Sequence, residues 1–165
     1  TPQQLFGAQK IILPGVGAAK SAMRALQKNG FDKAIPRLTV PFLGICLGLQ
    51  LLSDFSEEGK VRCLGVITGR VKKFSDRELK VPQVGWNSVQ FSKQSPLFKK
   101  ISDNSYFYFV NSFYFDAPQE TTLGKTLYTL SFPSVIQKKN FYAVQFHPEK
   151  SGEQGLQLLR NFCEL

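Results

Sequence analysis

The sequence predicts an α/β fold, a three-layer sandwich with a mixed, mainly parallel sheet. Two observations favour this fold. In the first third of the chain, short apolar runs are each followed by a segment with helical spacing. In the second half, segments rich in β-branched and aromatic residues alternate with turns, and a helical pattern closes the chain. Helices that follow buried strands are typical of layered α/β domains, and the later segments add antiparallel strands.

The first half of the chain predicts two strand–helix units. The apolar run 10–13 ends at a Pro-Gly pair, and helical spacing follows over 18–28 until an Asn-Gly pair. The apolar run 40–45 leads into a second expected helix, from Cys46 to about Phe55. Each unit therefore places a loop at the carboxyl end of a buried strand.

The second half predicts strands and one closing helix. Lys139-Asn140 is expected to form a hairpin turn, and Ser151 is expected to be the N-cap of a helix that ends near Phe162. Five segments carry the β-branched and aromatic residues that favour strands, namely 66–74, 84–91, 106–115, 126–132 and 135–146.

Length and composition indicate one globular domain over residues 1–165. The chain is 42% hydrophobic and 20% charged, and it shows neither a secretory signal nor a run of the roughly 18 apolar residues that a membrane helix needs. Lys and Arg number 21 against 12 Asp and Glu, a net charge of +9, but the basic residues are dispersed, which favours a solvated surface over nucleic-acid binding. Three widely spaced cysteines and one histidine argue against disulfides and zinc, so we expect a cytoplasmic protein without a cofactor.

The segment Gly44-Ile45-Cys46-Leu47-Gly48 predicts a nucleophile elbow. It follows an apolar strand and opens a helix, which is the setting this motif requires, with Cys in the usual Ser position. Glycines permit the sharp turn, and a helix N-terminus is expected to lower the pKa of the thiol. A buried core cysteine is the commoner fate, so the pentapeptide alone does not decide between the two interpretations.

His147 and Glu149 favour the interpretation of Cys46 as a catalytic nucleophile over that of a buried core cysteine. His147 is the only histidine in the chain, so an imidazole base for Cys46 from this chain must be this residue. Glu149 lies two residues further on, close enough in sequence to orient the ring. Cys46, His147 and Glu149 together predict a catalytic triad, whereas the acidic residues of segment 54–58 predict only a solvated patch.

Three short segments resemble a known family, the triad-type glutamine amidotransferases. They are PGVG at 14–17, PFLGICLGLQLL at 41–52 and YAVQFHPEKS at 142–151. Two more segments, VPQVGWNSV at 81–89 and YFYFVNSFY at 106–114, resemble the glutaminase subunits of imidazole glycerol phosphate synthases. The resemblance covers nearly the whole chain.

The resemblance implies hydrolysis of glutamine to glutamate and ammonia through Cys46, His147 and Glu149. It implies a heterodimer in which a (β/α)8 synthase subunit receives the ammonia for histidine biosynthesis. It also assigns further residues to this site: Val16 and Leu47 to the oxyanion hole, Gly15, Gly17, Gln50, Ser112 and Phe113 to substrate binding, and Pro82, Trp86 and Tyr108 to the partner interface.

The chain departs from this family in two ways. The family begins with a strand, a loop and a helix that precede anything here, so we expect the chain, which starts at Thr1, to lack a unit on the order of 30 residues. Gln83 stands where the family usually has His, and Asn111 and Phe113 stand where it usually has His and Tyr. Two alternatives stay open, an amidotransferase that serves another acceptor, such as a surface sugar, and an inactive interaction module.

Overall fold

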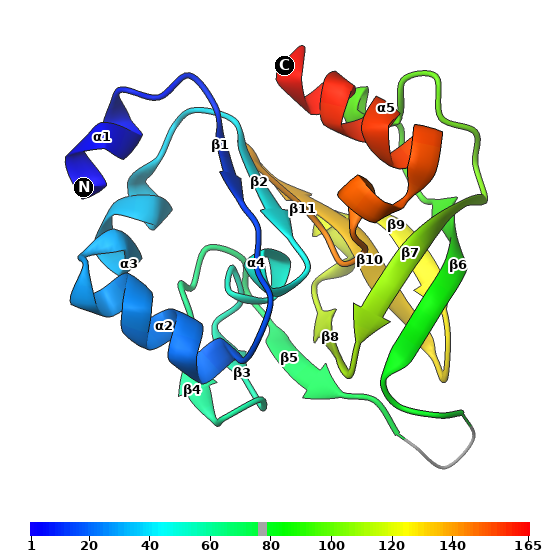
Figure 1. Ribbon diagram of the computed structural model, residues 1–165, viewed down its shortest axis with the longest axis horizontal. Coiled ribbons are helices and arrows are strands. Elements are labelled where there is room, and N and C mark those ends of the chain that lie inside the picture. The colour runs from blue at the N-terminus through cyan, green and yellow to red at the C-terminus, as the bar shows by residue number, and fades with distance from the viewer. Residues whose placement is uncertain (76–78) are drawn as a thin grey trace.

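A mixed sheet forms the centre of the molecule in the computed structural model (Figure 1). The structure describes residues 1–75 and 79–165. Within these residues seven strands pair in the order β1-β2-β11-β10-β9-β6-β7. Their bounds are Ile11–Leu13 for β1, Phe42–Ile45 for β2, Gln83–Phe91 for β6, Ser105–Asn111 for β7, Thr122–Leu127 for β9, Ser131–Lys138 for β10 and Phe141–Val144 for β11.

A smaller sheet and several helices cover the central sheet. In the same part of the chain four short strands pair in the order β4-β3-β5-β8, with bounds Phe55–Ser56 for β3, Val61–Arg62 for β4, Arg70–Lys73 for β5 and Phe113–Asp116 for β8. The α-helices are α1 (Pro2–Phe6), α2 (Ala19–Lys28), α3 (Phe31–Ala34), α4 (Leu47–Gln50) and α5 (Gly152–Cys163). Single 3₁₀ turns are η1 (Ile35–Arg37), η2 (Pro96–Phe98), η3 (Gln119–Thr121) and η4 (Pro148–Lys150).

Two hydrophobic cores lie on opposite faces of the central sheet. Along β2, Phe42 packs into the core that contains α2, whereas Leu43 packs into the core that contains α5. Side chains of a strand alternate between faces, so a strand buried on both faces is apolar throughout, as β2 is. The helices α1 to α3 and α5 accordingly lie on opposite sides of the sheet in Figure 1, and the predicted three-layer α/β architecture is confirmed.

The expected excess of parallel strands is not found. β2 runs parallel to both neighbours, β1 and β11. The four remaining pairings of the central sheet within the described residues are antiparallel. Parallel neighbours need a crossover connection, which α2 provides between β1 and β2, whereas most later strands follow one another through short turns.

Three predicted elements end earlier than their patterns suggest. The helix after Cys46 is the single turn α4, because the carbonyls of residues 51–53 accept hydrogen bonds from the loop 64–67 instead of continuing a helix. The segment 106–115 divides at Ser112 into β7 and β8, which belong to different sheets. The segment 126–132 contains the turn between β9 and β10. None of the helices described spans a membrane, since none is both long and apolar enough.

Candidate active site

Cys46 occupies a strained elbow between β2 and α4. Its backbone has φ 53° and ψ −109°, a conformation that costs a non-glycine residue about 1–3 kcal/mol. The turn is this tight because neighbouring chain segments touch at glycine. A Cβ on Gly48 would lie 2.0 Å from the Leu13 carbonyl oxygen, and a Cβ on Gly44 would lie 2.7 Å from that of Gly48. The structure therefore has the backbone geometry that the elbow prediction requires.

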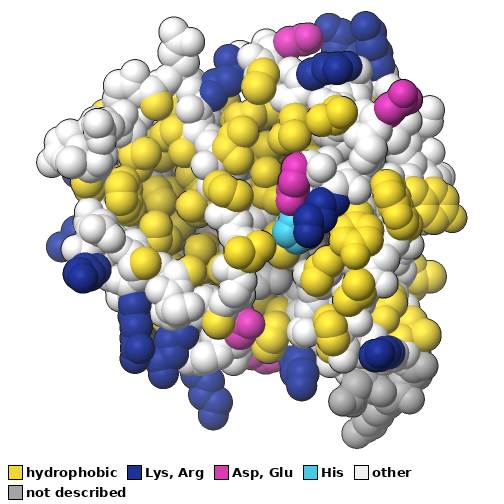
Figure 2. Space-filling view, in the orientation of Figure 1, with side chains coloured by type: hydrophobic (Ala, Val, Ile, Leu, Met, Phe, Trp, Pro, Cys, Tyr) yellow, Lys and Arg dark blue, Asp and Glu magenta, His cyan; other side chains and the backbone are white. Residues whose placement is uncertain are grey.

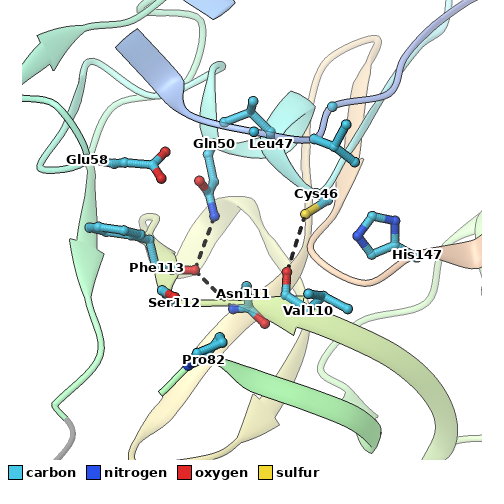
Figure 3. Close-up of a pocket in the computed structure, with 13 residues that line it drawn as sticks. Cys46, Leu47, Gln50, Glu58, Pro82, Val110, Asn111, Ser112, Phe113 and His147 are labelled. Carbon is cyan, nitrogen blue, oxygen red and sulfur yellow. Dashed lines mark hydrogen bonds between the residues drawn. The ribbon is translucent and has the colours of Figure 1, made fainter. Parts of the chain in front are cut away.

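The elbow opens into a cavity of about 280 Å³, and most of the predicted site residues line it (Figure 3). Cys46 and His147 both line it, although 101 positions separate them in sequence. The other predicted residues in its wall are Gly15, Val16, Gly17, Leu47, Gln50, Pro82, Ser112 and Phe113. Glu58, Val110 and Asn111 complete the lining.

His147 is held in place through both its ring and its backbone. Its Nδ1 lies 2.8 Å from Glu149 Oε1; because a carboxylate only accepts, Nδ1 donates this hydrogen bond, and Nε2 carries no proton in the neutral ring. The His147 amide donates to the Tyr108 carbonyl at 2.9 Å. Ser151 precedes α5 as predicted, but its hydroxyl does not cap that helix; it donates to the His147 carbonyl at 2.6 Å and accepts from the Tyr108 amide at 2.9 Å.

Burial raises the pKa of the Cys46 thiol from an ordinary 9.0 to about 11. The Leu47 backbone N–H and the Gln145 side chain lower this pKa, whereas the charges of Glu149 and Glu58 raise it. The expectation that the helix N-terminus would make the thiol acidic is therefore wrong in its net sign. The Leu47 donor acts as expected, but α4 is one turn long and burial outweighs it.

The backbone of residues 110–113 forms the wall across from the elbow (Figure 3). The Cys46 thiol donates to the Val110 carbonyl at 3.9 Å, a contact drawn in Figure 3. Gln50 Nε2 donates to the Phe113 carbonyl at 3.1 Å. At Ser112 the chain leaves the central sheet, and at Phe113 it joins the smaller one, where Phe113 pairs with Lys73. Residues 112–113 border the cavity at the point where the two sheets separate. These are the backbone positions expected around a bound substrate.

Sequence reasoning missed the roles of Glu58 and Gln145. Glu58 is half-buried, lines the cavity and accepts from the Ala19 amide at 2.8 Å, so the segment 54–58 is more than a solvated patch. The partner of Glu58 is 39 positions away, and no local pattern signals such a contact. Gln145 stands beside His147 in the histidine motif, but the motif alone assigned it no role. Among the described residues no cluster of three or more His, Cys, Asp or Glu side chains could hold a metal ion.

Trp86 and Tyr108 lie outside the cavity, on the outer face of the β6–β7 pair. They are cross-strand neighbours, and their rings meet edge to face at 6.1 Å. Trp86 is 56% exposed, and Val84 and Tyr106 on the same face are 61% and 60% exposed. Figure 2 shows hydrophobic side chains gathered over these strands beside the histidine. The sequence left the exposure of Trp86 open, and the structure places it at the surface.

Comparison with known proteins establishes the family. The model of the class-I glutamine amidotransferases matches residues 4–165. The chain belongs to this family. Solved structures agree in fold: the crystal structure of a glutamine amidotransferase has a TM-score of 0.73 at 17% identity over 99% of this chain and 82% of its own. The glutaminase domain of Trypanosoma brucei CTPS with bound acivicin has a TM-score of 0.68 at 16% identity over 99% and 74%.

Sequence relatives of this amidotransferase indicate which group within the family it resembles. Imidazole glycerol phosphate synthase subunit HisH of Haemophilus influenzae is 51% identical over 161 residues, 98% of this chain and 80% of its own. Subunit HisH of Methanocaldococcus jannaschii is 51% identical over 166 residues, 99% of this chain and 84% of its own. The resemblance to these glutaminase subunits is confirmed, whereas the expected absence of an N-terminal unit stays a prediction.

Proposed function

We propose that this amidotransferase is the glutaminase subunit of an imidazole glycerol phosphate synthase. It hydrolyses glutamine to glutamate and ammonia, and a synthase subunit uses the ammonia in histidine biosynthesis. Relatives that are about half identical over nearly the whole chain are named imidazole glycerol phosphate synthase subunit HisH. The observation that carries the proposal is the arrangement of Cys46 at a strained elbow, in one cavity with a histidine whose other nitrogen bonds Glu149.

The first step transfers the thiol proton to His147. A thiol with a pKa near 11 is almost wholly protonated at neutral pH, so it needs a base within the site. His147 Nε2 takes the proton while Glu149 stabilises the imidazolium through Nδ1. The thiolate then attacks the side-chain amide carbon of glutamine, and the electrons of the carbonyl bond move onto its oxygen.

In the later steps His147 gives that proton to the leaving nitrogen, and then carries a second proton from water to the thiolate. The backbone N–H groups of Val16 and Leu47 bind the oxyanion, and one such donor is typically worth about 3 kcal/mol. His147 protonates the nitrogen, the C–N bond breaks, and ammonia leaves a glutamyl thioester on Cys46. His147 next takes a proton from water, whose oxygen displaces the thiolate, and glutamate departs as the thiol re-forms. Gly15, Gly17, Gln50, Ser112 and Phe113 bind the glutamine.

The outer face of β6 and β7 is the proposed docking surface for a (β/α)8 synthase subunit in a cytoplasmic heterodimer. Pro82, Trp86 and Tyr108 supply the contact, and an exposed aromatic anchor can dominate such binding. The net charge of +9 favours an acidic partner face. Strand β7 forms part of this face. Its Tyr108 carbonyl also accepts a hydrogen bond from the backbone amide of His147 in the candidate active site.

Kinetic assay of the chain with a synthase subunit tests the proposal. We expect ammonia release from glutamine to rise when the loaded synthase subunit is added, and imidazole glycerol phosphate to form. Cys46→Ala should abolish both, whereas Cys163→Ala, which alters an exposed cysteine, should leave both unchanged. Glutamine hydrolysis that supports a different acceptor, or none in any mixture, would refute the proposed function.

A further inference from the structure

A continuous chain of hydrogen bonds between buried and half-buried groups ends on the Cys46 sulfur. Asn111 Nδ2 and Gln50 Nε2 both donate to the Phe113 carbonyl, at 3.0 Å and 3.1 Å. Gln50 Nε2 also donates to Gln145 Oε1 at 3.0 Å. Gln145 Nε2 in turn lies 3.7 Å from Cys46 Sγ, a donor–sulfur contact. Gln145 is fully buried, at the point where β11 leads into the His147 segment.

This chain fixes which end of the Gln145 amide faces the sulfur. The Phe113 carbonyl can only accept, so the nitrogen of Gln50 must face it. The same nitrogen meets Gln145, whose oxygen must therefore face Gln50. A reversed Gln145 would oppose two NH₂ groups and turn a carbonyl toward the sulfur. The donor is consequently directed at Cys46 by its neighbours.

A donor at this position distinguishes the two protonation states of Cys46. The thiol satisfies itself by donating to the Val110 carbonyl, which a thiolate cannot do. A buried thiolate instead needs donors, and hydrogen bonds to a charged form favour that form. Among the described residues, the ionisable groups that line the cavity with the sulfur are His147, which takes the proton, and Glu58. The charges of Glu58 and of Glu149, which lies behind His147, oppose the thiolate. Gln145 is a neutral group that acts in the opposite direction.

We propose that Gln145 is a positioning residue that holds the Cys46 thiolate for attack, with its amide locked in the donating orientation by Gln50. The inference rests on the proposed function, because it concerns the nucleophile of that reaction. The proton still moves from Cys46 Sγ to His147 Nε2. Gln145 makes and breaks no covalent bond, and its N–H···S contact shortens as charge develops on the sulfur.

Alkylation of the chain by iodoacetamide over a neutral to alkaline pH series measures the thiol directly. Mass spectrometry follows the Cys46 peptide, and exposed Cys163 in the same molecule is the internal reference. Gln145→Met should raise the apparent pKa of Cys46 by about one unit, or slow its alkylation about tenfold at a fixed lower pH. Gln145→Glu keeps the shape and the acceptor for Gln50, but it places an oxygen against the sulfur, so its shift should be larger.

Asn161→Leu is the matched control. Asn161 is another buried amide, which donates to the Leu97 and Lys99 carbonyls and belongs to α5. It should leave the Cys46 titration unmoved, and thermal melts check that each variant folds. Where Gln145→Met does not fold, Gln145→Glu and Gln50→Met, which unlocks the amide, carry the test.

An unshifted Cys46 titration in the folded Gln145 or Gln50 variants would overturn the inference. An equal shift in Asn161→Leu would overturn it as well. A failure of the proposed function would be detected in a different assay, as glutamine hydrolysis that persists in Cys46→Ala. That result would not change the measured titration of the Cys46 thiol.

Discussion

The cavity around Cys46 and the outer face of β6 and β7 share strand β7 but differ in construction. Cys46 and His147 are 8% and 6% exposed, and glycine contacts and hydrogen bonds fix their surroundings. Trp86 and Tyr106 are 56% and 60% exposed on an apolar face. The surroundings of Cys46 and His147 can therefore be altered only by disturbing buried groups, whereas the face can change with little effect on folding.

Strand β7 serves both regions because side chains and backbone point in different directions. Tyr106, Tyr108 and Val110 alternate with the fully buried Phe107 and Phe109. The carbonyls of Tyr108 and Val110 contact the His147 amide and the Cys46 thiol. A partner that presses on the face would displace the same strand that contacts Cys46 and His147, which gives the proposed coupling a physical route.

The largest expected effect is on the cavity itself. Cys46→Ala should reduce ammonia release by at least about a thousandfold, because the nucleophile is lost. His147→Ala should be comparably severe, and the double variant should lose little more, since triad members act as a unit. Steady-state glutaminase assays with the partner present measure this. Substantial release by Cys46→Ala would contradict the role given to the elbow.

A stability effect should follow from filling the elbow. Gly48→Ala would place a Cβ 2.0 Å from the Leu13 carbonyl oxygen, so backbone must move. We expect a loss of about 3 kcal/mol in the free energy of unfolding. Gly7→Ala is the control, because its Cβ meets only the Gln4 carbonyl oxygen at 3.8 Å. Urea denaturation compares the two, and equal midpoints would show that the elbow is not tightly packed.

Substitutions on the exposed face should change the affinity for the synthase subunit and not the stability of the chain. Trp86→Ala should weaken association with the synthase subunit by about 2 kcal/mol, while the stability of the isolated chain changes by less than about 0.5 kcal/mol. Leu156→Ala, on α5, also removes an exposed apolar side chain, and it should change neither the affinity for the synthase subunit nor the stability. Titration calorimetry and denaturation decide the matter. An unchanged affinity of Trp86→Ala for the synthase subunit would show that this face is not part of the interface.

The smallest effect concerns the pH dependence of stability. The folded pKa of Cys46, about 11, lies above its ordinary 9.0, so the unfolded chain loses this proton first as pH rises. The contribution of the thiol is intact below pH 9 and declines as pH rises toward 11. By pH 10 the native chain should lose about 1 kcal/mol more than Cys46→Ala does. Denaturation midpoints of both at pH 8 and pH 10 test this, and a constant difference would argue against a buried neutral thiol.

The residues of the candidate site and most of the fold could be predicted because their signals are local. The elbow, the lone His147 and Glu149 lie in short motifs, and the alternation of apolar residues marks the strands. The break at Ser112 could not be predicted, since the pattern of 106–115 is continuous and only pairing with different sheets divides it. Gln145 and Glu58 depend on contacts distant in sequence.

The pKa of Cys46 shows a different limit of the sequence. The motif identified the donor at the helix N-terminus correctly, but the sign of the net shift depends on how deeply the sulfur is buried. Burial results from the packing of β2, α4 and β7 together and has no local signature. The mixed sheet is a similar case, because the balance of parallel and antiparallel pairs depends on which strands become neighbours.

Covalent labelling by acivicin, a thiol-reactive analogue of glutamine, tests most directly whether Cys46 is the nucleophile of a glutamine site. Peptide mass mapping should find one adduct, on Cys46, that excess glutamine suppresses and that forms far more slowly in His147→Ala. Half-buried Cys63 and exposed Cys163 should stay unmodified. An adduct on Cys163 alone, or a Cys46 adduct that glutamine does not suppress, would contradict the account.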